Sequence, residues 1–186
     1  MKIIFAGDSI TASGKWAEVI NFAEVANFAV PGGSTDGLLE AIPKIASTKP
    51  DLVSILIGTN DFGNPEINRE GSDVGARVLA IVDELKAQAP RAQIILHTIL
   101  PRGLEASGVD LRTRVIEANE FIKANLPAGI ELIDLWPRFV AADGLSLADQ
   151  FVLPEELVLK LHLNENGYRE WITVLLPMLQ RMANAK

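Results

Sequence analysis

A few residues of this chain are of the types that could together transfer an acyl group. Acyl transfer to a hydroxyl needs the hydroxyl itself, a base that takes its proton, and hydrogen-bond donors for the oxyanion that forms. Ser9 supplies a hydroxyl where the apolar run at residues 3–6 ends and residues 10–12 can open a helix. Backbone N–H groups at such a junction are free to face an anion. Within these ten residues alone, a helix cap is the simpler interpretation of Ser9.

Donors for an oxyanion are available from three positions: the backbone N–H of Ser9, the backbone N–H of Gly32 and the side-chain amide of Asn60. A glycine at position 32 permits close approach of substrate and unusual backbone angles. An asparagine after a buried strand needs hydrogen-bond partners. Taken singly, each has a simpler interpretation, a plain turn for Gly32 and a local Asx turn for Asn60.

If the chain is a serine hydrolase, the candidate bases are its two histidines. His97 lies inside the apolar run at residues 94–100, which predicts a buried strand residue with a satisfied hydrogen bond. His162 lies just before a predicted helix cap at Asn164, so it can reach Ser9 as a general base. His162 is therefore the predicted base.

Composition narrows the classes of protein that remain. The 186 residues predict one domain over 1–186. A net charge of −7 and a pI near 4.9 argue against nucleic acid or an anionic membrane as a partner. The chain has no cysteine and two histidines, which excludes a disulfide and a Cys- or His-rich metal centre, and we expect no cofactor. No apolar run is long enough to span a membrane, and the first strand leaves no room for a signal peptide. Unless a leader has been removed, the predicted location is cytoplasmic; the oligomeric state is not predicted.

The positions of these residues depend on a predicted parallel sheet. Apolar runs that alternate with helical patterns indicate right-handed β-α-β units with helices on both faces. Ligands bind at the carboxyl ends of the strands in such sheets, where Ser9, Gly32 and Asn60 fall. Leu38, Leu39, Ile42 and Ile45 follow at helical spacing, which predicts a helix with Thr35 or Asp36 as its N-cap and a kink at Pro43. The five strand candidates are residues 3–6, 24–30, 52–57, 94–100 and 130–135, and the segments without periodicity are 62–72, 101–109 and 136–160.

Four motifs, in order along the chain, resemble those of the SGNH hydrolases, also called the GDSL esterase/lipase superfamily. They are Gly7-Asp8-Ser9, Gly32, Gly58-Thr59-Asn60-Asp61, and His162-Leu163-Asn164 with Gly167-Tyr168. The resemblance covers the whole chain. It implies a flavodoxin-like three-layer α/β/α sandwich with strand order 2-1-3-4-5, Ser9 as nucleophile, Ser9, Gly32 and Asn60 as oxyanion hole, His162 as base, and generally no metal.

The chain departs from that family pattern at one position. The family places an aspartate three residues before the histidine, where this chain has Leu159. Three explanations are open. A carboxylate from the irregular stretch replaces it, a backbone carbonyl or water orients the ring in a Ser-His dyad, or the chain is a weakened relative that still binds ligand. We expect the dyad or its water-bridged form. The candidate replacement acids are Glu155, Glu156, Asp149 and Asp143.

These observations predict an esterase or deacylase that cleaves a small ester through an acyl-Ser9 intermediate. The rim loops are short, which favours short acyl groups or sugar acetates over long lipid tails. Phe62, Trp136 and Leu163 are candidates to line an acyl pocket, although core packing is the simpler interpretation of each. The alternative from another class is a non-catalytic ligand-binding module on the same fold, whose support in the sequence is Leu159.

Overall fold

The computed structural model describes residues 1–63, 66–105, 108–156 and 158–184. Its centre is a five-stranded parallel sheet with strand order β2-β1-β3-β4-β5, as the family resemblance implies. The strands are β1 (Lys2–Gly7), β2 (Glu24–Asn27), β3 (Leu52–Leu56), β4 (Gln93–His97) and β5 (Glu131–Ile133). All five predicted strands are therefore present, each a little different in length from its apolar run.

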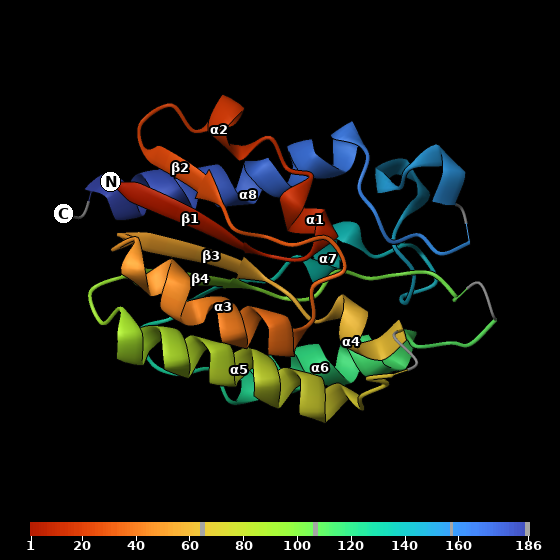
Figure 1. Ribbon diagram of the computed structural model, residues 1–186. Coiled ribbons are helices and arrows are strands. Elements are labelled where there is room, and N and C mark those ends of the chain that lie inside the picture. Colours follow the sequence, from red (N-terminus) through yellow and green to blue (C-terminus); the bar gives the residue numbers. More distant parts are fainter. Residues whose placement is uncertain (64–65, 106–107, 157, 185–186) are drawn as a thin grey trace.

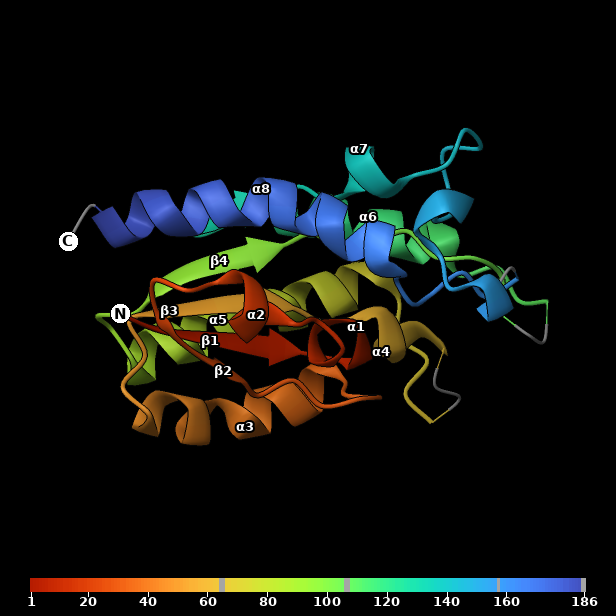
Figure 2. The same cartoon turned by 90° about the horizontal axis from the view of Figure 1, so that it is seen from above.

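Two helical layers cover the sheet. In Figure 1, α3 (Thr35–Ser47), α5 (Gly71–Gln88) and α6 (Arg112–Ala124) lie below the strands, and α8 (Glu165–Asn184) lies on the opposite side. Figure 2 shows α8 running along the length of the sheet. The chain thus forms the predicted three-layer sandwich, because each face of a sheet of buried apolar strands has to be covered.

Alternation along the strands divides the core into two parts. Ile4 and Ala6 of β1 pack with the α3, α5 and α6 side, whereas Ile3 and Phe5 pack with the α8 side. Successive side chains of a strand point to opposite faces, which explains this division. The second part is built around Trp171 of α8, which is fully buried.

The remaining elements are short, and all except the helix at Trp16–Val19, which packs beside β2, lie at or near the carboxyl edge of the sheet (Figure 1). They are α1 (Ser9–Ala12), α2 (Trp16–Val19), α4 (Thr59–Gly63), α7 (Trp136–Phe139) and the 3-10 helices η1 (Asp149–Phe151) and η2 (Pro154–Glu156). The stretch 136–160 therefore contains short helices rather than being wholly irregular, and α4 begins inside the motif that ends β3. Turns as short as α4, α7, η1 and η2 have no sustained period, which is why the sequence pattern did not reveal these four. The helix expected to open at residues 10–12 is present as α1.

One predicted cap is wrong. The N-cap of α3 is Ser34, whose hydroxyl accepts from Gly37 N–H at 3.4 Å, whereas Thr35 and Asp36 are already helical. Thr35 instead contacts a buried carboxylate, as described below. Pro43 lies within α3, which continues through it to Ser47.

Within the described parts of the chain, we find no helix whose length and apolar character would let it cross a membrane.

Candidate active site

Ser9 is positioned by the turn from β1 into α1. The N-cap of α1 is Asp8, whose carboxylate accepts from Ile10 N–H at 3.0 Å. Ser9 is the first residue of the helix, so its hydroxyl is not used as a cap. The cap interpretation of Ser9 is therefore wrong, and its Oγ instead lies 2.9 Å from Nε2 of His162. The predicted nucleophile and the predicted base are thus within hydrogen-bond distance.

Glu156 holds the other side of the His162 ring. Its Oε1 lies 2.5 Å from His162 Nδ1, and its Oε2 accepts from the backbone N–H groups of His162 at 2.9 Å and Leu161 at 3.2 Å. The expectation of an unsupported dyad is wrong: a carboxylate replaces the acid missing at Leu159. An acceptor at Nδ1 favours the tautomer with a proton on Nδ1, which leaves Nε2 free to accept from Ser9.

The charge state of Glu156 suits this role. Burial opposes ionisation of its carboxyl, but the hydrogen bonds from His162 and the charge of that ring outweigh burial and lower the pKa of Glu156. Glu156 is therefore an anion at neutral pH. It is placed to stabilise a positive charge on His162.

Local structure explains why a glutamate six residues before the histidine can reach it. Val152 and Leu163 form an antiparallel bridge, and Leu153 N–H donates to the carbonyl of His162 at 3.1 Å. The chain between them folds back, since Lys160 N–H donates to the carbonyl of Glu156 at 2.7 Å. The bridge and the turn together bring Glu156 against the imidazole.

Leu159 has a different use in this chain. Its carbonyl accepts from Gly103 N–H at 2.7 Å, which ties the turn to the segment after β4. A Cβ on Gly103 would overlap the backbone of Val158 and Leu159, so a side chain at position 103 would push the two segments apart.

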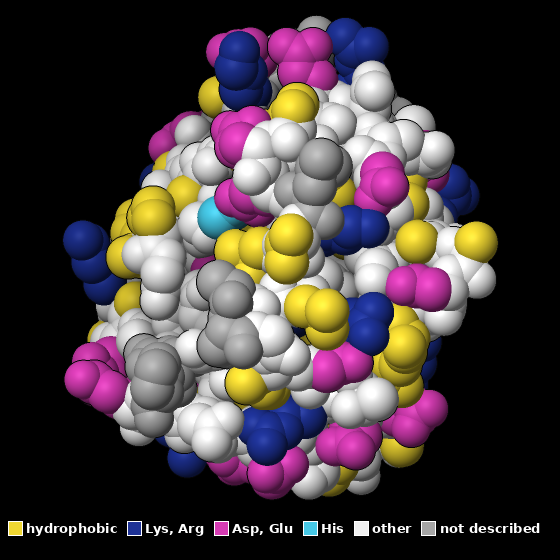
Figure 3. All heavy atoms as spheres, turned by 90° about the vertical axis from the view of Figure 1, so that its right-hand side faces the viewer, with side chains coloured by type: hydrophobic (Ala, Val, Ile, Leu, Met, Phe, Trp, Pro, Cys, Tyr) yellow, Lys and Arg dark blue, Asp and Glu magenta, His cyan; other side chains and the backbone are white. Residues whose placement is uncertain are grey.

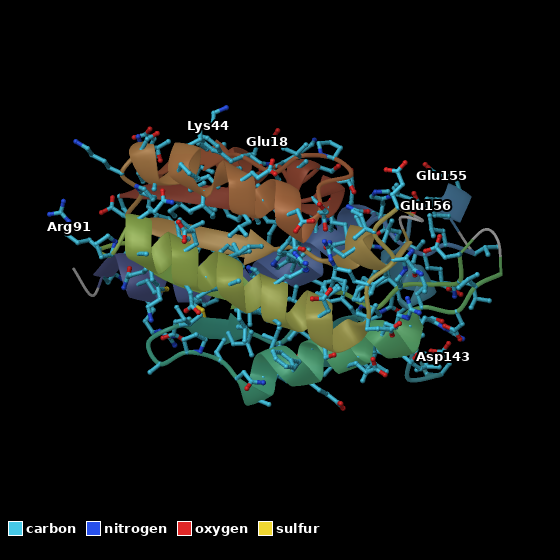
Figure 4. All side chains as sticks on the ribbon, turned by 60° about the horizontal axis from the view of Figure 1, so that its bottom comes forward. Glu18, Lys44, Arg91, Asp143, Glu155 and Glu156 are labelled. Carbon is cyan, nitrogen blue, oxygen red and sulfur yellow. The ribbon has the colours of Figure 1, made fainter. Side chains whose placement is uncertain are left out.

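The other candidate acids have other positions. Asp149 pairs with Lys160 at 2.5 Å, and Asp143 accepts from Ser146 and pairs with Arg112. Glu155 is exposed. Figure 4 shows Glu155 and Glu156 close together on one segment, with Asp143 well away from both.

Asn60 and the loop that contains Gly32 also meet at this edge. The Asn60 amide Nδ2 donates to the carbonyl of Gly33 at 2.9 Å, a contact between segments that are distant in the sequence. The loop is also tied to β1, because Val30 N–H donates to the carbonyl of Gly7 at 3.0 Å. Within the loop, Gly33 N–H donates to the carbonyl of Val30 at 2.8 Å. Gly32 has φ +75°, an angle that favours glycine, and open space where a Cβ would lie.

Asp61 connects the Asn60 motif to α3. It is fully buried and accepts from Thr35 N–H at 3.0 Å and from the Thr35 hydroxyl at 2.5 Å. Arg69 donates to it at 2.8 Å and also reaches Asp36 at 2.6 Å. The prediction from sequence missed this group. The sequence did contain a signal for this group, because Asp61 lies shortly after a buried strand and a buried carboxylate needs hydrogen-bond or ion-pair partners.

The surface of this edge combines the expected residue types. In Figure 3, which faces the carboxyl ends of the strands, histidine atoms reach the surface beside acidic and hydrophobic side chains. His97 does not contribute to this surface. It is buried with Nε2 2.9 Å from Ser54 Oγ, and burial lowers the pKa of its ring to about 3, so the ring is neutral. Its Nδ1 has no hydrogen-bond partner among the described residues, so the predicted satisfied histidine is satisfied at one nitrogen.

The three candidates for an acyl pocket belong to the core. Phe62 and Leu163 are buried at 1% and 3% exposure, and Trp136 is partly buried against the α3, α5 and α6 side. Core packing thus accounts for all three, although Leu163 also contributes to a surface groove described below.

The carboxyl group of Asp8, the residue before Ser9, has a strongly raised pKa. It is fully buried, and its Oδ2 has no hydrogen-bond partner among the described residues. Burial raises the pKa of Asp8 to about 7, against the lowering effects of Ile10 N–H and of the nearby His162. The folded state therefore holds a proton on Asp8 that the unfolded chain releases near pH 4.

We expect Asp8→Asn to change how stability depends on pH. Between about pH 4 and about pH 7 the native state binds one proton more than the unfolded state, so this carboxyl lowers the free energy of unfolding as pH rises. Asparagine keeps an oxygen for Ile10 N–H and cannot ionise. Urea unfolding at several pH values should show the variant gaining a few kcal/mol relative to wild type between pH 4 and pH 7. Stability curves that run parallel over this range would contradict the assignment.

The described residues contain no cluster of three or more His, Cys, Asp or Glu side chains that could hold a metal ion. The structure brings a hydroxyl, an imidazole and a carboxylate into contact, and it places the Asn60 amide against the loop that contains Gly32.

Comparison with known proteins defines the class. The model of the GDSL-like Lipase/Acylhydrolase family matches residues 5–170, so the chain belongs to this family of hydrolases. A relative in chicken (Gallus gallus), platelet-activating factor acetylhydrolase IB subunit alpha2, is 29% identical over 158 residues. The match covers 80% of this chain and 66% of the relative, so the chain spans about two thirds of that protein.

Solved structures share the fold. A GDSL-like lipase from Bacteroides thetaiotaomicron superposes with a TM-score of 0.82 at 18% identity, covering 100% of this chain and 89% of the other. A carbohydrate esterase family 3 structure from Talaromyces cellulolyticus superposes with a TM-score of 0.69 at 15% identity, covering 99% of each chain.

Proposed function

We propose that this protein is a serine ester hydrolase that cleaves short-acyl esters through an acyl-Ser9 intermediate. The observation that carries the proposal is the continuous contact from Ser9 Oγ to His162 at 2.9 Å and from His162 to Glu156 at 2.5 Å. Hydroxyl, base and orienting acid in this order form an activated nucleophile, which a helix cap or a packing role would not require.

The chemistry follows from these contacts. His162 Nε2 takes the Ser9 proton as Oγ attacks the ester carbonyl carbon, and Glu156 stabilises the imidazolium that results. The carbonyl oxygen becomes an anion, for which the proposed donors are the N–H groups of Ser9 and Gly32 and the Asn60 amide. An NH₂ group has two hydrogens, so the Asn60 contact with Gly33 leaves one for substrate.

The names of two proteins that resemble this chain support a preference for a short acyl group. The relative is named as an acetylhydrolase, and one structural neighbour is a carbohydrate esterase. A small acyl group also needs no deep pocket, and the three side chains predicted as candidates to line an acyl pocket pack in the core instead.

A non-catalytic binding module is the alternative, and its support was Leu159. The Glu156 contact supplies the acid whose absence favoured that alternative, so we do not propose it.

Reaction with a fluorophosphonate tests the proposal. The reagent needs an activated serine with an oxyanion hole, and we expect one adduct, located at Ser9 by mass spectrometry of the digested protein. The exposed Ser47 should not react. Release of acid from p-nitrophenyl acetate provides the second readout. A protein that gives neither an adduct at Ser9 nor hydrolysis is not a serine esterase.

A further inference from the structure

A surface groove of about 560 Å³ begins beside His162 and lies between the α1–α2 segment and the first half of α8. Apolar side chains form much of its wall, among them Trp16, Val19, Leu163 and Ile172. Its volume is in the range of small-molecule sites. The groove is far larger than an acetyl group requires.

The position of the groove indicates which part of an ester it would hold. His162 lines it, whereas Ser9, Gly32 and Asn60 do not. In ester cleavage the acyl carbon stays on the serine and the oxyanion faces its donors. The leaving alcohol oxygen, by contrast, must receive its proton from the histidine. The alcohol part of the substrate therefore lies on the His162 side of the reacting carbon.

We propose that this groove is the subsite for the alcohol portion of the ester, and that it selects bulky, neutral, largely apolar alcohols. The proposal rests on the proposed function. Attack forms the Ser9 Oγ–carbon bond and breaks the carbon–oxygen bond to the alcohol, and the proton taken from Ser9 passes through His162 to the alcohol oxygen. Water then attacks the acyl-serine, His162 takes a proton from that water, and the acid leaves as Ser9 recovers its hydrogen.

The charges around the groove support a neutral occupant. Its lining includes two cations, Lys15 and Arg169, and two carboxylates, Glu18 and Glu165. Arg169 and Glu165 pair with each other at 3.5 Å, and Glu18 reaches outward at the surface in Figure 4. Neither sign dominates, so the rim gives no strong preference for a charged alcohol, and apolar contact with the wall sets the selectivity.

Tyr168 keeps the two sides of the groove together. Its hydroxyl donates to the carbonyl of Ile10 at 2.7 Å, which joins α8 to α1. Burial raises the pKa of Tyr168 to about 12, so this donor stays protonated at the pH of any assay proposed here. This hydrogen bond therefore links the two helical segments that border the groove.

A series of acetate esters tests the proposal with the acyl group held constant. Phenyl acetate and its 4-methyl, 4-ethyl and 4-butyl derivatives differ in the apolar size of the alcohol and little in its acidity. We expect kcat/KM to rise along the series by at least tenfold in total, within the ceiling of about fourfold per fully buried methylene. Phenyl butyrate and phenyl hexanoate extend the acyl side instead, and we expect no such rise for them.

Two matched variants locate the effect. Val19 lines the groove and Phe22 does not, and both are 37% exposed. Val19→Asp should lower kcat/KM for the 4-butyl ester by more than it lowers kcat/KM for phenyl acetate, so that most of the gain along the series is lost, whereas Phe22→Asp should keep the gain. Ile172→Ala provides a second groove variant that introduces no charge and should reduce the gain as well.

The outcomes separate this proposal from the proposed function. If phenyl acetate is hydrolysed but kcat/KM does not rise along the alcohol series, the groove is not the alcohol subsite, while the proposed esterase function still holds. A rise along the acyl series that Val19→Asp abolishes would assign the groove to the acyl group and also overturn the proposal. Absence of both hydrolysis and a fluorophosphonate adduct would end both proposals together.

Discussion

Replacing Ser9 or His162 with alanine should lower kcat for p-nitrophenyl acetate by about 10⁶-fold, the loss seen when a nucleophile or base is removed from a serine triad. The two side chains act as one unit, because the imidazole is useful only with a hydroxyl to deprotonate at 2.9 Å. The double variant should therefore be no slower than either single variant. Steady-state rates of the three proteins, measured at equal concentration of folded protein, check this.

The control for these variants is Ser47→Ala. Ser47 is exposed, and its hydroxyl donates to the carbonyl of Lys44 within its own helix. Its rate should match wild type. If the Ser9→Ala protein hydrolyses the ester as fast as wild type, Ser9 is not the nucleophile.

Glu156→Gln should lower kcat by about 10⁴-fold, as loss of a triad acid does where it has been measured. Glutamine can still accept from the backbone N–H groups of His162 and Leu161, so the turn should fold. It removes the negative charge, however, and an amide NH₂ turned toward Nδ1 would favour the tautomer with a proton on Nε2. That proton faces Ser9 and prevents the ring from acting as a base.

Glu155→Gln is the matched control, because the same change of charge occurs on the neighbouring exposed residue. It should retain wild-type kcat, and both variants should bind substrate similarly. Equal kcat values for wild type and Glu156→Gln would show that the 2.5 Å contact is not used in turnover.

Leu159→Asp should give no gain in rate. The acid position at Nδ1 is already filled by Glu156, and a second carboxylate would be redundant or repulsive. Leu159 is also fixed through its carbonyl to Gly103. An increase in kcat for Leu159→Asp would mean that Glu156 supports the ring poorly.

Sequence pattern predicts the fold class and the edge of the sheet at which the candidate site lies, whereas the strand order was implied by the family resemblance. Buried apolar strands alternating with amphipathic helices allow few arrangements other than a parallel sheet between two helical layers. The carboxyl edge of such a sheet brings strand ends together, so Ser9 and Asn60 could be placed at one edge from pattern alone. The count of two histidines then left His162 as the base.

The carboxylate that contacts His162 Nδ1 could be identified only from the folded chain. Four carboxylates lay in a stretch without periodicity, and nothing in their spacing separates Glu156 from Glu155, Asp149 or Asp143. The bridge between Val152 and Leu163 and the turn that follows Glu156 select it, and both depend on backbone hydrogen bonds between segments.

The N-cap of α1 could also be identified only from the folded chain. Asp8 and Ser9 are both good capping residues, so their types do not distinguish them. The backbone at the end of β1 places Asp8 at the cap and leaves the Ser9 hydroxyl beside His162. Residue types and their periodicity determine which elements form. Two similar side chains one residue apart in a turn can each be suited to the same contact. The packed chain determines which of them makes it.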